Sequence, residues 1–121
     1  MLVRCVKIID AFGDPVDAYP GMTIGRSYPV LEISYWVDAY YVRVVDDDGT
    51  DSIWSPEMFE TVDGHIPRCW SVALDNDGSL RLAPKAWLRQ GFWTDQLSDE
   101  PNAVAEYEKG RTSILAELMT E

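Results

Sequence analysis

Few side chains in this sequence could take part in acid–base or nucleophilic chemistry. It contains one histidine, His65, and two cysteines, Cys5 and Cys69. General-base catalysis needs a histidine that a carboxylate orients towards a nucleophile, and one histidine in a loop-like segment does not establish that arrangement. Cys69 precedes Trp70 and an apolar stretch, a setting typical of a buried structural thiol. We therefore expect no catalytic residue, and a protein that is not an enzyme.

A run of aspartates at residues 46–51 carries enough carboxylates to bind calcium. If Asp46 opened an EF-hand loop, Asp51 would stand at the sixth position, where the sharp turn requires glycine. Gly49 comes two residues too early, and the Asp48-Gly49 step is instead a strong hairpin signal. The cysteines lack further ligands at zinc spacing, and no glycine-rich phosphate loop occurs. We expect neither a metal nor a cofactor.

Acidic residues outnumber basic ones by 21 to 10, and the formal net charge is -11. Proteins that bind nucleic acid gain most of their affinity from Lys and Arg near phosphates, so this balance disfavours direct nucleic-acid binding. It favours a basic protein partner. The alternative is that the acidity serves solubility alone.

The elements that must position these residues are mostly short strands. Turn-forming residues are frequent at positions 12–25 and indicate a long loop between two strands, and not a regular element. A hairpin turn is expected at residues 46–51, and one helical turn at 55–59 with Ser55 as N-cap and Pro56 first. The strands predicted for the first half are 2–9, 28–33, 40–45, 52–54 and 59–62.

The second half combines a hairpin with helices. Strands are expected at 69–74 and 79–82 around an Asp-Asn-Asp-Gly turn, and they would extend the first sheet. A short helix follows at 84–89 and a longer one at 102–119. Gly110 costs that helix about 1 kcal/mol relative to alanine, which leaves a kink there or two shorter helices as alternatives. The pattern predicts an α+β, mainly β, fold.

Three segments, 21–31, 41–49 and 54–59, resemble bacterial SH3-like small β-barrels. In that family a glycine precedes a Tyr-x-Val strand, an acidic Asp-Gly hairpin joins the next two strands, and a one-turn helix with Pro and Phe precedes the last. The resemblance covers about residues 1–65 and implies an SH3-like barrel, with the hairpin and C-terminal helices of 66–121 packed on it. The segment after Asp10 departs from the Ala-Leu-Tyr-Asp-Tyr type of eukaryotic SH3 domains.

A single domain is expected over residues 1–121, because this length is common for one domain. The first apolar stretch contains Arg4 and Lys7, and no apolar run reaches the roughly 18 residues that a spanning helix needs. We expect a cytoplasmic protein that keeps its thiols reduced, as a monomer or small homo-oligomer, and that does not bind membranes.

Aromatic side chains and acids are expected to form one partner-binding surface. Tryptophan and tyrosine are common interface anchors, and carboxylates attract a basic partner. For Trp54, Trp70 and Trp87 a place in the core is the better interpretation, whereas Tyr35 and Trp36 fit either core or surface. The candidate partner-binding residues are Tyr35, Trp36, Asp38, Tyr40, Asp46, Asp47, Asp48 and Asp51.

The leading hypothesis is a bacterial inhibitor of the immunity or antitoxin kind that binds and blocks a basic partner such as a toxin nuclease. It rests on the small size, the acidity and the lack of a catalytic signature. In these features the chain resembles small acidic immunity-type proteins, and this resemblance is weaker than the one to SH3-like barrels. One alternative is an SH3-like adaptor of bacterial or phage origin with another protein partner. A nucleic-acid mimic with carboxylates spaced along one face is a further alternative.

Overall fold

The computed structural model describes residues 1–36 and 39–119, so the predicted site residue Asp38 lies outside the described residues. The fold is α+β and mainly β, with a C-terminal helix, as the sequence predicted. The elements are β1 (Leu2–Cys5), β2 (Ile8–Ile9), β3 (Pro15–Val16), β4 (Ser27–Trp36), β5 (Ala39–Val45), β6 (Asp51–Trp54), η1 (Pro56–Met58), β7 (Phe59–Asp63), β8 (Trp70–Leu74), β9 (Leu80–Pro84), η2 (Lys85–Leu88), α1 (Phe92–Leu97) and α2 (Pro101–Met119).

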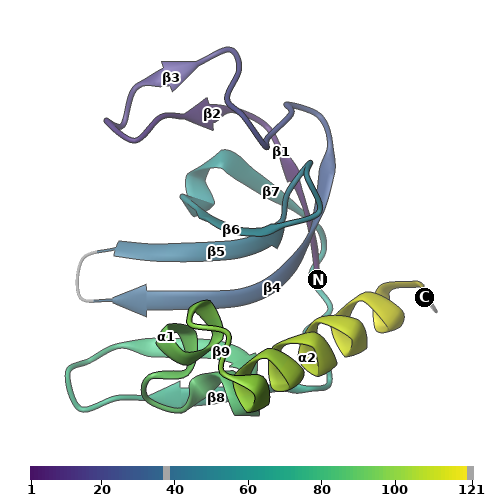
Figure 1. Ribbon diagram of the computed structural model, residues 1–121. Coiled ribbons are helices and arrows are strands. Elements are labelled where there is room, and N and C mark those ends of the chain that lie inside the picture. Colours follow the sequence, from purple (N-terminus) through teal and green to yellow (C-terminus); the bar gives the residue numbers. More distant parts are fainter. Residues whose placement is uncertain (37–38, 120–121) are drawn as a thin grey trace.

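Seven strands form one sheet, and a separate two-stranded hairpin stands above it (Figure 1). The main path runs β6-β5-β4-β1-β7, and β9 pairs with β4 while β8 pairs with β9. The predicted hairpin of the second half is therefore confirmed, and it extends the first sheet. In the described part of the chain β6 and β7 do not pair with each other, so the sheet stays open.

The ten-residue strand β4 organises the sheet. Along one edge its start pairs with β1 and its end with β9, while β5 covers the other edge. A register shift between Val30 and Glu32 interrupts the pairing with β5. Val30 belongs to one buried cluster and the next residue, Leu31, to a second cluster. Consecutive side chains of a strand point to opposite faces, so these two residues of β4 reach two different cores.

The first core lies on the inner face of the sheet, beneath the β2–β3 hairpin. Cys5, Val30 and Val44 are fully buried in it. The expected strand 2–9 is split here, because the chain leaves β1 after Cys5 and β2 pairs with β3. The expected helical turn is confirmed as η1, although the Ser55 side chain makes no capping hydrogen bond.

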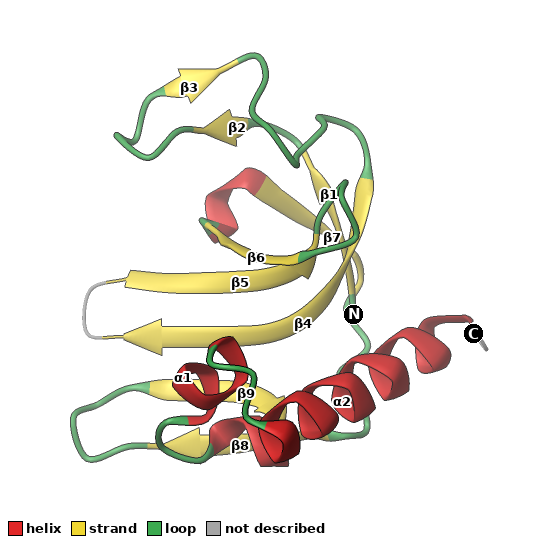
Figure 2. Ribbon diagram, viewed as in Figure 1, coloured by secondary structure: helices red, strands yellow, loops and turns green. Residues whose placement is uncertain are grey.

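The second core lies on the outer face, under η2, α1 and α2, which Figure 2 shows in red. Trp87 is fully buried at its centre and stacks on Tyr107 of α2, with ring centroids 5.3 Å apart. Its indole Nε1 donates a hydrogen bond to the Glu106 carbonyl at 3.2 Å. A Cβ at Gly110 would lie 2.9 Å from three Trp87 ring atoms. The glycine therefore allows the indole to approach α2.

The helix α2 runs without interruption from Pro101 to Met119, so the alternative of two shorter helices is wrong. Packing against Trp87 outweighs the low helix propensity of glycine at this position. Within the described residues, no helix has the length and apolar character needed to cross a membrane.

Candidate functional site

The predicted aromatic residues lie at the end of the β4–β5 hairpin. Tyr35 and Tyr40 are cross-strand partners with ring centroids 6.3 Å apart, and both are exposed. Trp36 is exposed as well and pairs with Ala39. The alternatives left open for Tyr35 and Trp36 are thus resolved in favour of the surface.

The predicted acidic turn lies at the opposite end of β5 (Figure 1). Trp36 pairs with Ala39 at one end of the β-ribbon, and Val45 pairs with Asp51 at the other. A strand of this length spans about 20 Å, at roughly 3.3 Å per residue. Tyr35, Trp36 and Tyr40 therefore lie at the opposite end of the ribbon from Asp46, Asp47, Asp48 and Asp51.

Three of the four predicted aspartates in this turn bind other parts of the protein. The Asp46 carboxylate accepts hydrogen bonds from the Asp48 and Thr50 amides, and from the Ser52 hydroxyl at 3.0 Å. The same Ser52 hydroxyl accepts the Trp54 indole N–H at 2.7 Å. Asp46 thus positions the Trp54 ring through one intermediate side chain.

Asp47 ties the turn to the segment that follows Gly21. Its carboxylate accepts the Thr23 hydroxyl at 2.7 Å and the Tyr28 hydroxyl at 2.8 Å, and it pairs with the Arg26 guanidinium at 2.7 Å. Desolvation acts to raise the pKa of Asp47, but these three hydrogen bonds hold it below its usual value. Its negative charge is therefore neutralised locally.

Asp51 faces the outer side of the sheet. It pairs with Arg43 at 2.8 Å and accepts the Tyr107 hydroxyl at 2.8 Å. Arg43 also contacts the buried carboxylate of Glu32 at 3.3 Å and lies 3.7 Å above the Trp93 ring. In the described structure only Asp48, of these four acids, has a carboxylate without a hydrogen-bond or ion-pair partner.

An aromatic groove lies where the β2–β3 hairpin meets β5, β6 and η1. Its volume is about 400 Å³. Tyr19 meets Trp54 edge to face, with ring centroids 5.7 Å apart, and the fully buried Met58 also lines it. Tyr41 and Ile53 lie on its β5–β6 side, and both are exposed. Exposed aromatic rings beside a buried floor are typical anchor points for another protein.

The hairpin above the groove is acidic. Residues 8–25 contain three aspartates and neither lysine nor arginine. Asp10 lines the groove, and its Oδ1 accepts the amides of Phe12 and Asp14, which fixes the hairpin tip. Asp14 and Asp17 are exposed. The structure therefore combines acids and aromatic rings at this groove, which the predicted site residues within the described chain do not line.

Two of the predicted aspartates, Asp46 and Asp47, hold elements of this groove in place without lining it. Asp46 holds Trp54 through Ser52, and Asp47 holds the segment leading from Tyr19 to β4. One signal for this groove was visible in the sequence: Tyr19 is an aromatic residue within the turn-rich segment 12–25. Tyr19 and Trp54 meet only through tertiary packing, which local patterns do not specify.

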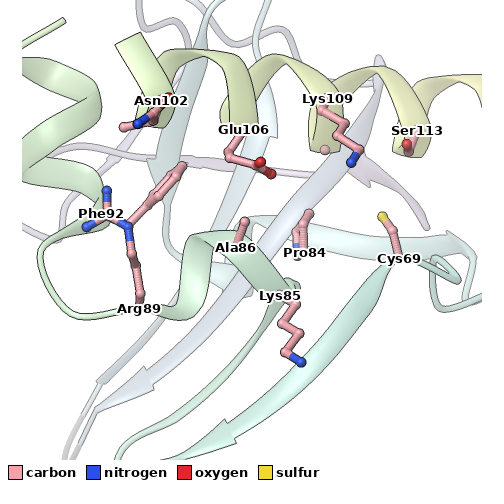
Figure 3. Close-up of a pocket in the computed structure, with 12 residues that line it drawn as sticks. Cys69, Pro84, Lys85, Ala86, Arg89, Phe92, Asn102, Glu106, Lys109 and Ser113 are labelled. Atoms are coloured by element: carbon pink, nitrogen blue, oxygen red, sulfur yellow. The ribbon is translucent and has the colours of Figure 1, made fainter. Parts of the chain in front are cut away.

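A second hollow, of about 660 Å³, separates α2 from η2 (Figure 3). Apolar side chains, including Pro84 and Phe92, line much of it. Glu106 and Lys109 extend into it from α2, and Lys85 and Arg89 also line it, so cations outnumber acids in this lining. Burial raises the pKa of the Cys69 thiol at its edge, which keeps that thiol protonated at neutral pH.

His65 connects the loop after β7 to α2. Its Nε2 lies 2.8 Å from the Glu117 carboxylate, which also accepts the Arg68 amide at 3.0 Å. The hydrogen bond from the Arg68 amide, followed by that from His65, lowers the pKa of Glu117. Among the described residues, no cluster of three His, Cys, Asp or Glu is placed to hold a metal ion.

No protein-family model matches the chain, and no curated protein or solved structure shows significant similarity to it.

Proposed function

We propose that this chain is a non-catalytic binding domain that captures an extended, basic segment of another protein in the aromatic groove. One observation carries this proposal. The groove is lined by Tyr19, Tyr41 and Trp54, and the hairpin beside it contains aspartates but no lysine or arginine. Aromatic rings give the contact area, and carboxylates select Arg or Lys side chains next to it.

The order of the elements supports an SH3-like interpretation of residues 1–65. The Asp-Gly hairpin between β5 and β6 and the one-turn helix η1 directly before β7 match features on which that resemblance rests, although the sheet does not close into a barrel among the described residues. On this interpretation the groove lies between the β2–β3 hairpin and the elements β5, β6 and η1, and the helices cover the outer face of the sheet.

Inhibition of a basic partner, as by an immunity protein or antitoxin, is the biological role that we propose for this binding. A net charge of -11 accelerates association with a cationic protein and suppresses contact with nucleic acid. The mimic of nucleic acid is less well supported, because Asp46, Asp47 and Asp51 are engaged in internal contacts. An adaptor would use the same groove, with a different partner.

The test uses a phage-displayed random peptide library panned against the purified chain. We expect the selected peptides to contain Arg or Lys next to apolar residues, and to bind less well as salt is raised. Tyr41→Ser should weaken their binding by about tenfold, because it removes a groove anchor. Asp14→Lys combined with Asp17→Lys should weaken it through charge reversal.

Tyr40→Ser is the matched control, because Tyr40 is the adjacent exposed tyrosine on β5 but lies outside the groove lining. It should leave peptide binding unchanged. Peptides without basic residues, or binding that Tyr40→Ser weakens and Tyr41→Ser does not, would overturn the groove assignment. A neighbouring reading frame for a basic toxin would separate inhibitor from adaptor.

A further inference from the structure

The strand β8 forms an unprotected edge of the sheet. It pairs with β9 on one side, and Figure 2 shows it as the outermost strand there. Its sequence, Trp70-Ser71-Val72-Ala73-Leu74, contains no charged residue, proline or glycine. The five residues pair with β9 in an unbroken register, so no bulge bends the edge away. Soluble proteins normally protect an edge with one of these devices.

The other two ends of the main sheet carry such protection. The edge strand β7 contains Glu60 and Asp63, and β6 begins with Asp51, which α2 contacts through Tyr107. In β8, by contrast, the side chains on one face are apolar and open to solvent, with Val72 60% and Leu74 79% exposed. Leu74 lies opposite Leu80 of β9, which in turn lies opposite Tyr35 of β4. An apolar row therefore runs across the sheet and ends at the β8 edge.

The charges beside β8 make this edge self-complementary. Arg68 precedes the strand with a side chain that is 89% exposed, although its Nε lies 3.8 Å from Glu117. Asp75 and Asp77 follow the strand, and hydrogen bonds from Ser79 lower the pKa of Asp77 and keep it ionised. Antiparallel pairing of two copies would place the basic end of each strand beside the acidic end of the other.

We propose that β8 pairs antiparallel with β8 of a second copy of this chain, around a twofold axis at Val72. This register puts Leu74 opposite Trp70 of the second copy, and it keeps the apolar side chains of both copies on one face. The interface is isologous, since each copy supplies the same strand and the same charges. The dimer joins two sheets into one and leaves the aromatic groove, on other elements, open in both copies.

Sedimentation velocity over a range of protein concentrations tests this proposal. The wild-type chain should show a concentration-dependent dimer. Val72→Lys should raise the dimer dissociation constant by about tenfold or more, because it places two like charges opposite each other at the axis. Val62→Lys, on the other edge strand, is the matched control, because Val62 is 52% exposed and should not affect the dimer.

Two further measurements distinguish pairing through β8 from other forms of association. Arg68→Glu should weaken the dimer, and the effect should shrink as salt is raised. Hydrogen exchange of the β8 backbone amides should slow with increasing concentration in the wild-type chain and not in Val72→Lys. Thermal unfolding verifies that each variant is folded.

A wild-type chain that sediments as a monomer at every concentration would overturn the proposal. Equal loss of the dimer in Val62→Lys and Val72→Lys would also overturn it, because the interface would then not be specific to β8. Protection of β8 amides only when a different protein is added would assign the edge to that protein instead.

Discussion

The contact between Gly110 and Trp87 shows how one missing side chain decides the packing of a helix. The indole ring is fully buried and its Nε1 is bonded to the Glu106 carbonyl, so it has little freedom to move away from α2. An alanine methyl group would lie 2.9 Å from three atoms of that ring. Close packing against Trp87, and not chain flexibility, explains why position 110 of α2 is a glycine.

Gly110→Ala should therefore destabilise the protein. Alanine improves helix propensity by about 1 kcal/mol, but overpacking a closed core costs typically 1–3 kcal/mol, and we expect a net loss of about 1 kcal/mol. Urea denaturation followed by circular dichroism measures the change. Thr112→Ala, at an exposed position of α2, is the control and should not destabilise. A stabilised Gly110→Ala variant would contradict the packing argument.

Asp47 should make the stability sensitive to acid. Its pKa is lower in the folded protein than the value of about 4 for an unfolded chain. Its contribution to stability is therefore complete above about pH 4 and disappears as the pH falls through the folded pKa. Asp47→Asn should be less stable at neutral pH, and its stability should fall less steeply than that of the wild type below pH 4. Urea titrations at several pH values measure this difference, and parallel pH curves would contradict it.

At the scale of elements, a buried polar network joins β4, β5 and β6 to the helices. Arg43 stands at its centre, between Glu32 and Asp51, with its guanidinium over Trp93. The Trp93 indole also donates to Glu32 at 3.3 Å. The network provides hydrogen bonds for charged groups that burial would otherwise penalise.

Arg43→Ala should reduce the free energy of unfolding by about 3 kcal/mol or more, because it leaves the buried Glu32 carboxylate without a cation. Arg4→Ala is the control, since Arg4 pairs with Glu60 where both side chains are about half exposed, at 50% and 47%. That exposed pair should contribute at most about 1 kcal/mol. Denaturation of both variants under one set of conditions measures the two losses in unfolding free energy. Similar losses would contradict a special role for Arg43.

Local chemistry made most of the elements predictable. The hairpin turns at Gly49 and Gly78 were found from their Asp-Gly steps, and both glycines have positive φ angles, 76° and 88°. The β2–β3 pair was missed, because two-residue strands carry no periodic pattern. The double pairing of β4 was missed as well, since it depends on partners more than twenty residues away in sequence.

At the scale of the whole molecule, the two cores share the sheet. Leu31 is fully buried in the second core although β4 lies in the first half of the chain. A fragment of residues 1–68 would expose Leu31 and the polar network around Arg43. We expect this fragment to lose cooperative unfolding or to unfold well below the full chain. Differential scanning calorimetry measures this, and a fragment with the full chain's unfolding temperature would contradict it.

The aromatic groove was predicted less well than the fold. Composition pointed to acids and aromatic rings as candidates, but it could not place them relative to each other. Tyr35 and Asp46 are close in sequence yet lie at opposite ends of β5, whereas Tyr19 and Trp54 meet across the fold. Which residues share a surface is decided by strand pairing, and pairing partners are not encoded locally.

The double pairing of β4 also has a consequence for synthesis on the ribosome. Ile33 pairs with Leu82, and the helix that covers the outer face begins only at Pro101. The first strands therefore leave the exit tunnel well before their cover exists, with Leu31 and the Glu32 carboxylate still in water. Nascent chains at this stage are those most in need of a chaperone, and a pause in translation before α2 would prolong that exposure.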